Sequence, residues 1–148
     1  MKYPLILAAF GIVTAGTAGA ETAMTVFKDP NCGCCAAWAD EMSKAGFEVT
    51  IRNLDYDALV TRKAEAGIPE EAYACHTAMI GDFAIEGHVP AAEIEAVMAE
   101  RPEADGIAVP GMPMGSPGMG ELTGDMSFDV MLIENGEIGP VVASYPPR

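Results

Sequence analysis

Three of the chain's four cysteines fall within Cys32-Gly33-Cys34-Cys35, and this cluster constrains the fold more than any other feature of the sequence. A structural disulfide normally joins distant segments rather than residues of a single turn. Cys32 and Cys35 have the C-x-x-C spacing of a dithiol redox site, and Cys34 adds a sulfur that such a site does not require. Clustered thiolates also select soft metals, so the motif predicts thiol chemistry, metal binding or both.

The N-terminus predicts export. Lys2 precedes an apolar run at residues 5–13, and a stretch of small residues ends at Ala18-Gly19-Ala20. The apolar run is too short to span a bilayer, and the A-x-A pattern marks a cleavage site. We therefore expect a signal peptide over residues 1–20, cleavage after Ala20 and a periplasmic mature protein that does not associate with the membrane. A helical anchor that is never cleaved is the alternative.

Length and charge restrict the classes of partner. Removal of 20 residues from the 148 leaves 128, and the loss of Lys2 changes the net charge from -14 to -15. This length suits one compact domain with its own core. The negative charge argues against nucleic acid or an anionic membrane surface as a partner. We expect a monomer that interacts with cations rather than polyanions.

An oxidising compartment leaves open the alternative that the four cysteines form two structural disulfides. Adjacent Cys34 and Cys35 would pair only with strain, whereas Cys32 is well spaced to reach Cys35. Cys34 and Cys75 would then remain as an uncertain second pair. Because the cluster lies within one turn, we favour a functional site over a purely structural role.

The order of predicted elements is β-α-β-α-β-β-α. Strand patterns cover residues 24–28, 47–53, 77–80 and 83–86, and helical patterns cover residues 34–45, 55–66 and the segment between Pro90 and Pro102. This order, with a C-x-x-C between the first strand and the first helix, resembles the thioredoxin fold over residues 24–101. A helix N-terminus favours thiolate over thiol, so the resemblance implies reactive sulfur.

One segment departs from the thioredoxin pattern. Thioredoxin-like proteins carry a cis-proline before the third strand, facing the dithiol, whereas this chain reads Cys75-His76-Thr77 there and Pro69 lies six residues before Cys75. His76 takes the aligned position, so we expect Cys75 and an imidazole to face the dithiol. Four sulfurs and an imidazole exceed what disulfide exchange needs, but a thiolate-bridged copper site would use them.

The C-terminal part begins near Asp105 and contains a loop. Residues 110–120 read PGMPMGSPGMG, which neither a helix nor an interior strand would accommodate. Met112, Met114 and Met119 are candidate thioether ligands for Cu(I). Packing of these flexible side chains into the core is an equal alternative. Residues 128–133 and 141–144, around Asn135-Gly136, then predict a β-hairpin that extends or covers the sheet.

The chain has two histidines, and each is a candidate ligand. The expected place of His76, beside Cys75 and opposite the dithiol, favours ligation or proton transfer over surface exposure. His88 lies in the turn before the last predicted helix, and for it ligation and a structural role are equally open. Trp38, one turn into the first helix, is expected to pack in the core near the site.

Several segments together resemble the CopG family of periplasmic copper-resistance proteins. They are residues 31–35 (NCGCC), 75–77 (CHT), 86–90 (EGHVP), 109–113 (VPGMP) and 115–119 (GSPGM). The resemblance implies a thioredoxin-like domain at residues 21–104 and a C-terminal extension at residues 105–148 that contributes to the metal site. It also implies copper bound by the thiolates of Cys32, Cys34, Cys35 and Cys75, with interconversion of Cu(I) and Cu(II).

These patterns predict a copper-binding oxidoreductase with copper as its cofactor. Cys32 and Cys35 form the predicted redox pair. The predicted metal ligands are Cys32, Cys34, Cys35, Cys75, His76, His88, Met112, Met114 and Met119. The expected partners are copper ions and periplasmic copper-efflux or redox proteins. A metal-free dithiol-disulfide oxidoreductase and a passive copper carrier are the alternatives.

Overall fold

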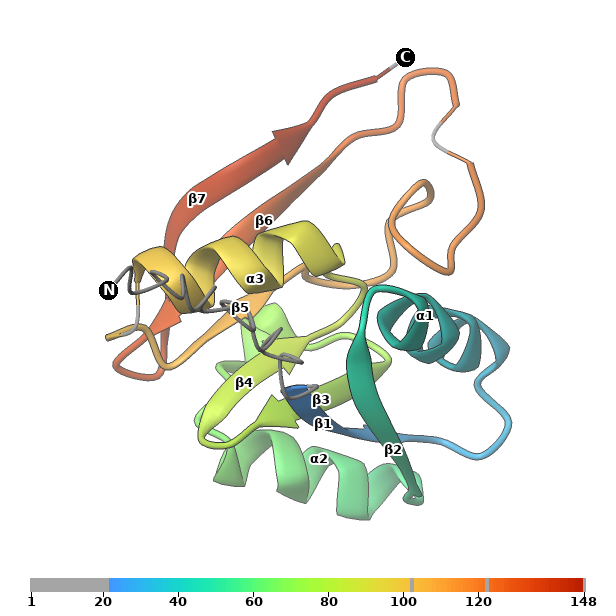
Figure 1. The fold of residues 1–148 in the computed structure, drawn as a ribbon, viewed down its shortest axis with the longest axis vertical. Helices are drawn as coiled ribbons and strands as arrows, with labels where there is room; N and C mark the ends of the chain where they lie inside the picture. The colour runs from blue at the N-terminus through green and yellow to red at the C-terminus, as the bar shows by residue number, and fades with distance from the viewer. Residues whose placement is uncertain (1–21, 102, 122, 148) are drawn as a thin grey trace, which may run out of the picture.

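A computed structural model describes residues 22–101, 103–121 and 123–147, so the predicted signal peptide lies outside the described residues. In these residues the chain forms seven strands and three α-helices (Figure 1). The strands are β1 (Thr22–Lys28), β2 (Phe47–Asn53), β3 (His76–Ile80), β4 (Phe83–Glu86), β5 (Gly106–Ala108), β6 (Phe128–Glu134) and β7 (Glu137–Tyr145); the helices are α1 (Gly33–Lys44), α2 (Tyr56–Glu65) and α3 (Ala91–Glu100), with a short 3-10 turn η1 (Glu70–Ala72).

The predicted order β-α-β-α-β-β-α is confirmed from β1 to α3. Local side-chain chemistry explains where α2 begins, because the Asp55 carboxylate caps it by accepting a hydrogen bond from the Ala58 N–H at 2.9 Å. The predicted C-terminal hairpin is also present. It turns at Asn135, whose φ of 56° is the left-handed conformation that an Asn-Gly hairpin turn requires.

All strands belong to one seven-stranded sheet in the order β2-β1-β3-β4-β5-β6-β7. Strands β1 and β2 are parallel, as are β4 and β5, and the other neighbours are antiparallel. The C-terminal hairpin therefore extends the sheet, which was one of the two predicted arrangements. The sequence patterns do not predict β5, a fully buried three-residue strand that joins the hairpin to β4.

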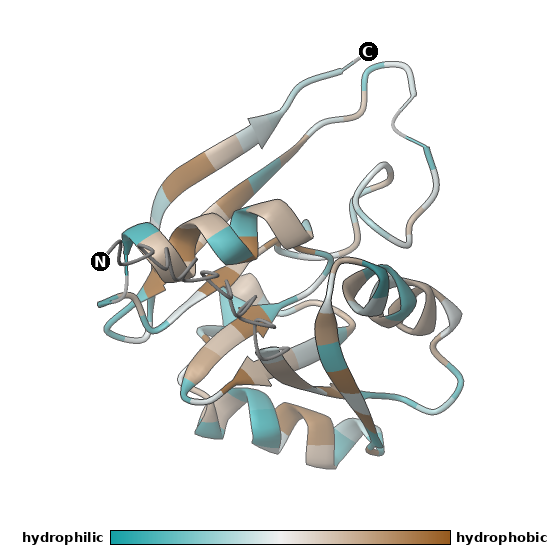
Figure 2. Cartoon of the chain, viewed as in Figure 1, coloured by the Kyte–Doolittle hydropathy of each residue, from teal (hydrophilic) through white to brown (hydrophobic). Residues whose placement is uncertain are grey.

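The helices cover both faces of the sheet. Helices α1 and α3 pack on one face, where the main hydrophobic core includes Met24, Val26, Trp38, Met42, Ile94 and Val97. Helix α2 covers the opposite face (Figure 1). On that face Arg62 lies over the ring of Phe27 at 4.9 Å from its centroid. Teal and brown residues alternate around α2 and α3 in Figure 2, as expected for helices with one face on a sheet.

The architecture is a mixed α/β fold. The likeness to the thioredoxin fold stays an interpretation of the β2-β1-β3-β4 strand order and of the position of α1 directly after β1. Within the described residues, no helix combines the length and the apolar composition needed to cross a membrane. The sheet runs without interruption across the predicted boundary at residues 104 and 105, because β5 pairs with both β4 and β6.

Candidate metal centre

The cysteine motif forms the N-terminus of α1. After β1 the chain turns at Asp29, whose carbonyl accepts a hydrogen bond from the Cys32 N–H at 3.1 Å. Cys32 is the N-cap residue, and its Sγ accepts a hydrogen bond from the Cys35 N–H at 3.4 Å. Because the first N–H groups of a helix are unpaired and its N-terminal end is electropositive, this position favours anionic sulfur.

Cys32 and Cys35 are joined in a disulfide with a Cα–Cα distance of 5.4 Å, as their spacing predicted. Among the described residues, Cys34 and Cys75 are free cysteines, so the second disulfide that the sequence left open is not formed. The Sγ of Cys34 lies 3.5 Å from that of Cys32. The site thus holds one oxidised pair and two reduced sulfurs side by side.

The structure brings the four cysteines together from two segments. The sulfur atoms of Cys32, Cys34, Cys35 and Cys75 all lie within 4.8 Å of one another. Cys75 reaches the motif because it directly precedes β3, which is antiparallel to β1 with His76 opposite Lys28. Cys35 is buried and the other three cysteines are half-buried, so an ion can approach the cluster from solvent.

A second, overlapping group consists of Cys75, His76 and His88, whose ligand atoms also lie within 4.8 Å of one another. The His88 Nε2 is 3.0 Å from the Cys75 Sγ, and its Nδ1 is 2.7 Å from the Pro117 carbonyl oxygen. A carbonyl only accepts, so Nδ1 carries the proton in the neutral ring and Nε2 keeps its lone pair. This is the arrangement that prepares a histidine for a metal.

His76 is fully buried against the same sulfur. Its Nδ1 lies 3.4 Å from the Cys75 Sγ, and within the described part of the chain its Nε2 has no hydrogen-bond partner. The ring of Trp38 packs against it with 4.4 Å between ring centroids, and the Trp38 Nε1 donates to the Val89 carbonyl at 2.8 Å. Trp38 is therefore buried in the core beside the site, as predicted.

Burial sets the protonation of these groups. It lowers the pKa of His76 well below its ordinary value and lowers the pKa of His88, so both imidazoles are neutral near pH 7. Burial and the neighbouring Cys34 raise the pKa of the Cys75 thiol to about 12. The imidazoles are thus already in the form that binds metal, whereas Cys75 must release a proton to do so.

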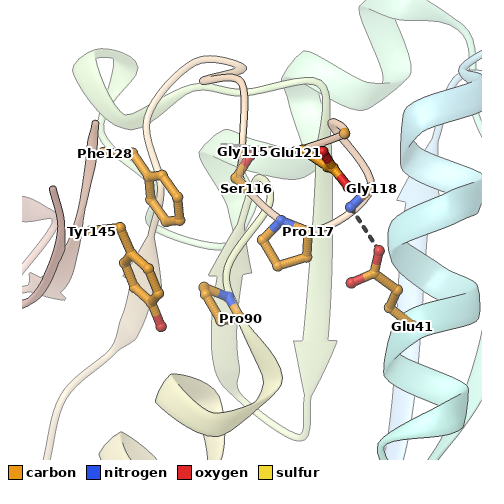
Figure 3. A pocket seen from close by; sticks show the side chains of 10 residues that line it. Glu41, Pro90, Gly115, Ser116, Pro117, Gly118, Glu121, Phe128 and Tyr145 are labelled. Atoms are coloured by element: carbon orange, nitrogen blue, oxygen red, sulfur yellow. Dashed lines mark hydrogen bonds between the residues drawn. The ribbon is translucent and has the colours of Figure 1, made fainter. Parts of the chain in front are cut away.

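The loop after β5 lies against α1 and His88. The Gly118 N–H donates to a Glu41 carboxylate oxygen at 2.9 Å, as Figure 3 shows. A Cβ on Gly118 would lie 2.7 Å from the Cys34 carbonyl oxygen and 2.8 Å from the Trp38 nitrogen, so only glycine permits this close contact. The Pro117 carbonyl also accepts a hydrogen bond from His88. The loop therefore contacts both the α1 side and the histidine side of the candidate centre.

The three methionines of the loop differ in exposure. Met112 is 55% exposed, Met114 is 44% exposed, and Met119 is half-buried. The alternative in which these residues fill the core therefore does not describe Met112 or Met114. The structure places them on the loop that contacts the site, and their role as ligands stays a prediction.

Two pockets lie near the site, one beside the loop and one beside Cys75. The larger, of about 650 Å³, lies between the loop, Pro90 and the stacked rings of Phe128 and Tyr145 (Figure 3). The smaller, of about 210 Å³, lies on the α2 side, and its lining includes Tyr56, Tyr73 and Cys75. The smaller pocket gives an approach to the Cys75 side of the centre.

Sequence reasoning missed two buried charged residues at this centre. Glu86, at the end of β4, is fully buried and forms an ion pair at 2.5 Å with Lys63 of α2, which is also buried. The chain contained a signal for this pair. Lys63 follows the buried Leu59 by four residues and so shares its inward face, and Glu86 ends an otherwise apolar strand.

The fold and the cluster define an α/β protein with a candidate metal site of cysteine sulfur and histidine nitrogen. Two solved structures, forms 1 and 2 of a copper resistance protein CopG, match it with 38% sequence identity over 86% of this chain. The matches cover 99% and 100% of those chains, with TM-scores of 0.76 and 0.77.

A family model described as a protein of unknown function, DUF411, matches residues 72–119, a range that includes Cys75, both histidines and the loop methionines. No curated protein matches the chain. Given the identity and coverage of the two solved structures, the chain belongs to the CopG family of copper resistance proteins. The resemblance seen in the sequence motifs is confirmed.

Proposed function

We propose that this protein binds copper ions at its cysteine cluster and interconverts Cu(I) and Cu(II). The observation that carries the proposal is the convergence of four cysteine sulfurs within 4.8 Å, two of them in a disulfide and two reduced. Copper ions are the substrate that the protein binds and converts in this proposal. The name of the relatives, copper resistance protein, supports this choice of metal.

The donor atoms fit copper. Thiolate and thioether sulfur suit Cu(I), and imidazole suits either oxidation state. His76 offers a buried Nε2 without a partner among the described residues, and His88 offers an Nε2 lone pair directed at Cys75. The candidate ligands are Cys32, Cys34, Cys35, Cys75, His76 and His88, with Met112, Met114 and Met119 as further donors from the loop.

The proposed redox step uses Cys32 and Cys35. As two thiols they lose two electrons and two protons when the S–S bond forms, and two Cu(II) ions accept one electron each to become Cu(I). In the reverse step two Cu(I) ions give one electron each to the disulfide, which takes up two protons, so that both thiols are restored and two Cu(II) ions are released. The Cys32–Cys35 disulfide in the structure is the oxidised end of this cycle. The reduced end offers four sulfurs to Cu(I) instead of two.

The setting of this activity is part of the proposal. The mature protein would begin at Glu21 in the periplasm and act as a monomer that exchanges copper or electrons with efflux or redox proteins. Residues 105–148 would contribute to the metal site through the loop. The contacts of Pro117 with His88 and of Gly118 with Glu41 support this contribution.

Replacement of Cys32, Cys34 and Cys35 by serine tests copper binding. We expect the mature wild-type protein purified from the periplasm to contain copper and the triple variant to contain none, because the variant keeps only one cysteine sulfur. Metal analysis measures this. Met126→Ser is a matched control, since Met126 is an exposed sulfur outside the candidate ligand set.

Unchanged copper content in the triple variant would contradict the proposal. Zinc in place of copper in the wild type would also contradict it and would favour a structural metal site. Disulfide turnover that proceeds equally without copper would favour the metal-free oxidoreductase. Copper uptake without any change in the number of free thiols would favour the passive carrier.

A further inference from the structure

A buried network of hydrogen bonds lies beneath the Cys75 side of the centre. The Glu86 Oε1 accepts from the Lys63 Nζ at 2.5 Å and from the Ala74 N–H at 2.6 Å. Its Oε2 accepts from the Thr77 hydroxyl at 2.6 Å, and the Lys63 Nζ also donates to the Thr77 Oγ1 at 3.0 Å. One carboxylate thus joins α2, β3 and the segment before β3.

The partners of Glu86 lie on both sides of the two candidate ligands. Ala74 precedes Cys75, and Thr77 follows His76, so the bonds from Glu86 fix the chain immediately before and after this pair. Gly87 and His88, which follow Glu86 at the end of β4, also contact Cys75 and His76. The Gly87 N–H donates to the His76 carbonyl at 3.0 Å, and the His88 Nε2 reaches the Cys75 Sγ at 3.0 Å.

The contact between these segments is close. A Cβ on Gly87 would lie 2.6 Å from the Ala74 Cβ and 2.5 Å from the Val109 carbonyl oxygen, and Gly87 has a φ of 72°. The backbone around residue 87 is therefore pressed against residues 74 and 109. In this packing the Glu86 side chain is long enough for its carboxylate to bond the Ala74 N–H and the Thr77 hydroxyl at the same time.

Stability alone does not account for a buried ion pair here. The cost of removing two charges from water is often as large as their attraction, and apolar side chains of the same size can serve equally well for stability. The hydrogen bonds to Ala74 and Thr77 offer a different reason. They are directional, and they end at the residues that flank Cys75 and His76.

We propose that Glu86 is a positioning residue that holds Cys75 and His76 in place for metal binding, with Lys63 as the counter-charge that permits its burial. The property that matters is the reach of the carboxylate to Ala74 and Thr77. None of the groups in this network belongs to the Cys32–Cys35 disulfide, so the network itself does not depend on the redox state of that pair. The metal part of this inference rests on the proposed function, whereas the positioning of the Cys75 thiol does not.

Two variants separate reach from charge. Glu86→Asp keeps the negative charge beside Lys63 but shortens the side chain by one methylene. The shorter side chain can no longer reach both the Ala74 N–H and the Thr77 hydroxyl. The double variant E86Q/K63M removes both charges but keeps the length and an oxygen acceptor for the Ala74 N–H. Glu48→Asp is the matched control, because Glu48 is an exposed strand glutamate. Circular dichroism and thermal unfolding check that each variant folds.

The first readout needs no metal. In a Cys34→Ser background with the Cys32–Cys35 disulfide intact, Cys75 is the only free thiol, and its rate of alkylation reports how firmly it is held. We expect alkylation several times faster in Glu86→Asp than in the background protein, and an unchanged rate in E86Q/K63M and Glu48→Asp. If Glu86→Asp fails to fold, Thr77→Val removes one of the bonds with little change of shape and is expected to accelerate alkylation to a smaller extent.

The second readout is Cu(I) affinity of the reduced protein with all cysteines present, measured by competition with a Cu(I) chelator. Loss of a group that orients a ligand typically weakens metal binding by about 10–100-fold, and we expect this for Glu86→Asp but not for E86Q/K63M. Wild-type rates and affinities in Glu86→Asp would overturn the inference. An equal effect of E86Q/K63M would also overturn it, because charge and not reach would then be responsible. If the wild type binds no copper, the proposed function fails while the alkylation rates still test the positioning.

Discussion

Single residues determine how the C-terminal loop meets the cysteine motif. Gly118 lies so close to Cys34 and Trp38 that any side chain would collide with their backbone atoms. Its neighbour Pro117 supplies the carbonyl oxygen that orients His88. The tautomer of a candidate ligand therefore depends on a loop residue 29 positions away in the sequence. Such a dependence is typical of metal centres, where partners of the ligands set their orientation.

Gly118→Ala should release the loop from α1. The new Cβ would meet the Cys34 oxygen and the Trp38 nitrogen, so we expect a loss of about 1–3 kcal/mol in the free energy of unfolding from overpacking and faster hydrogen exchange over residues 111–120. Chemical denaturation and hydrogen-exchange mass spectrometry measure the two effects.

Gly124→Ala provides the control for Gly118→Ala. Gly124 also has a positive φ, of 63°, but no atom lies within 4 Å of a Cβ built on it. This variant therefore carries the backbone strain without the collision. Equal exchange in the loop of both variants would contradict close packing of Gly118 against α1.

At the scale of elements, the loop between β5 and β6 is the part of the site that copper should change most. Its residues Pro117 and Gly118 contact His88 and α1, but Met112 and Met114 are largely exposed. Exposed thioethers on a loop rich in glycine and proline have conformational freedom that coordination to a bound ion would remove. Metal binding is thus expected to order an element that packing alone leaves exposed.

We predict that hydrogen exchange across residues 109–120 slows when Cu(I) is added to the reduced apo-protein. The comparison is made with the variant in which Met112, Met114 and Met119 are replaced by leucine, which keeps the apolar volume but removes the thioethers. A similar slowing in both proteins would assign the ordering to Pro117 and Gly118 and not to the methionines. No change in the wild type would contradict a role for the loop in metal binding.

The elements differ in how well the sequence predicts them. Strands β1 to β4 and helices α1 to α3 follow from periodicity and from turn and cap residues such as Asp55, which act locally. Strand β5 has three residues, too few to show an alternating pattern, and is formed by its pairing with β4 and β6. Its presence depends on neighbours that a local pattern does not contain.

The candidate site likewise has parts that the sequence predicts and parts that depend on tertiary packing. The spacing of Cys32 and Cys35 predicts their pairing, and the resemblance to the thioredoxin fold predicts that Cys75 and His76 face them. The ion pair of Glu86 with Lys63 joins residues 23 positions apart on β4 and α2, so it depends on how the helix packs on the sheet. The contact of His88 with Pro117 depends likewise on the path of a loop, which the sequence left open.

At the scale of the whole molecule, two segments that are distant in sequence form one chemical unit. The chain carries a net charge of -14, which favours the approach of cations. The α1 motif supplies a disulfide that can open, and the β3 and β4 ends supply Cys75 and two neutral imidazoles. Under the proposed function, disulfide state and copper occupancy would use the same sulfur atoms, so each would affect the other.

The most direct test of this coupling is a titration of the protein in a thiol redox buffer, with and without Cu(I), in which free thiols are counted at each potential. In the proposed function Cu(I) binds the thiolates of the reduced form, so we predict that it shifts the midpoint of the Cys32–Cys35 couple to a more positive potential. A shift of about 30 mV corresponds to about 1.4 kcal/mol for this two-electron couple. A midpoint that copper leaves unchanged would contradict the account, because the metal and the disulfide would then not share their sulfur atoms.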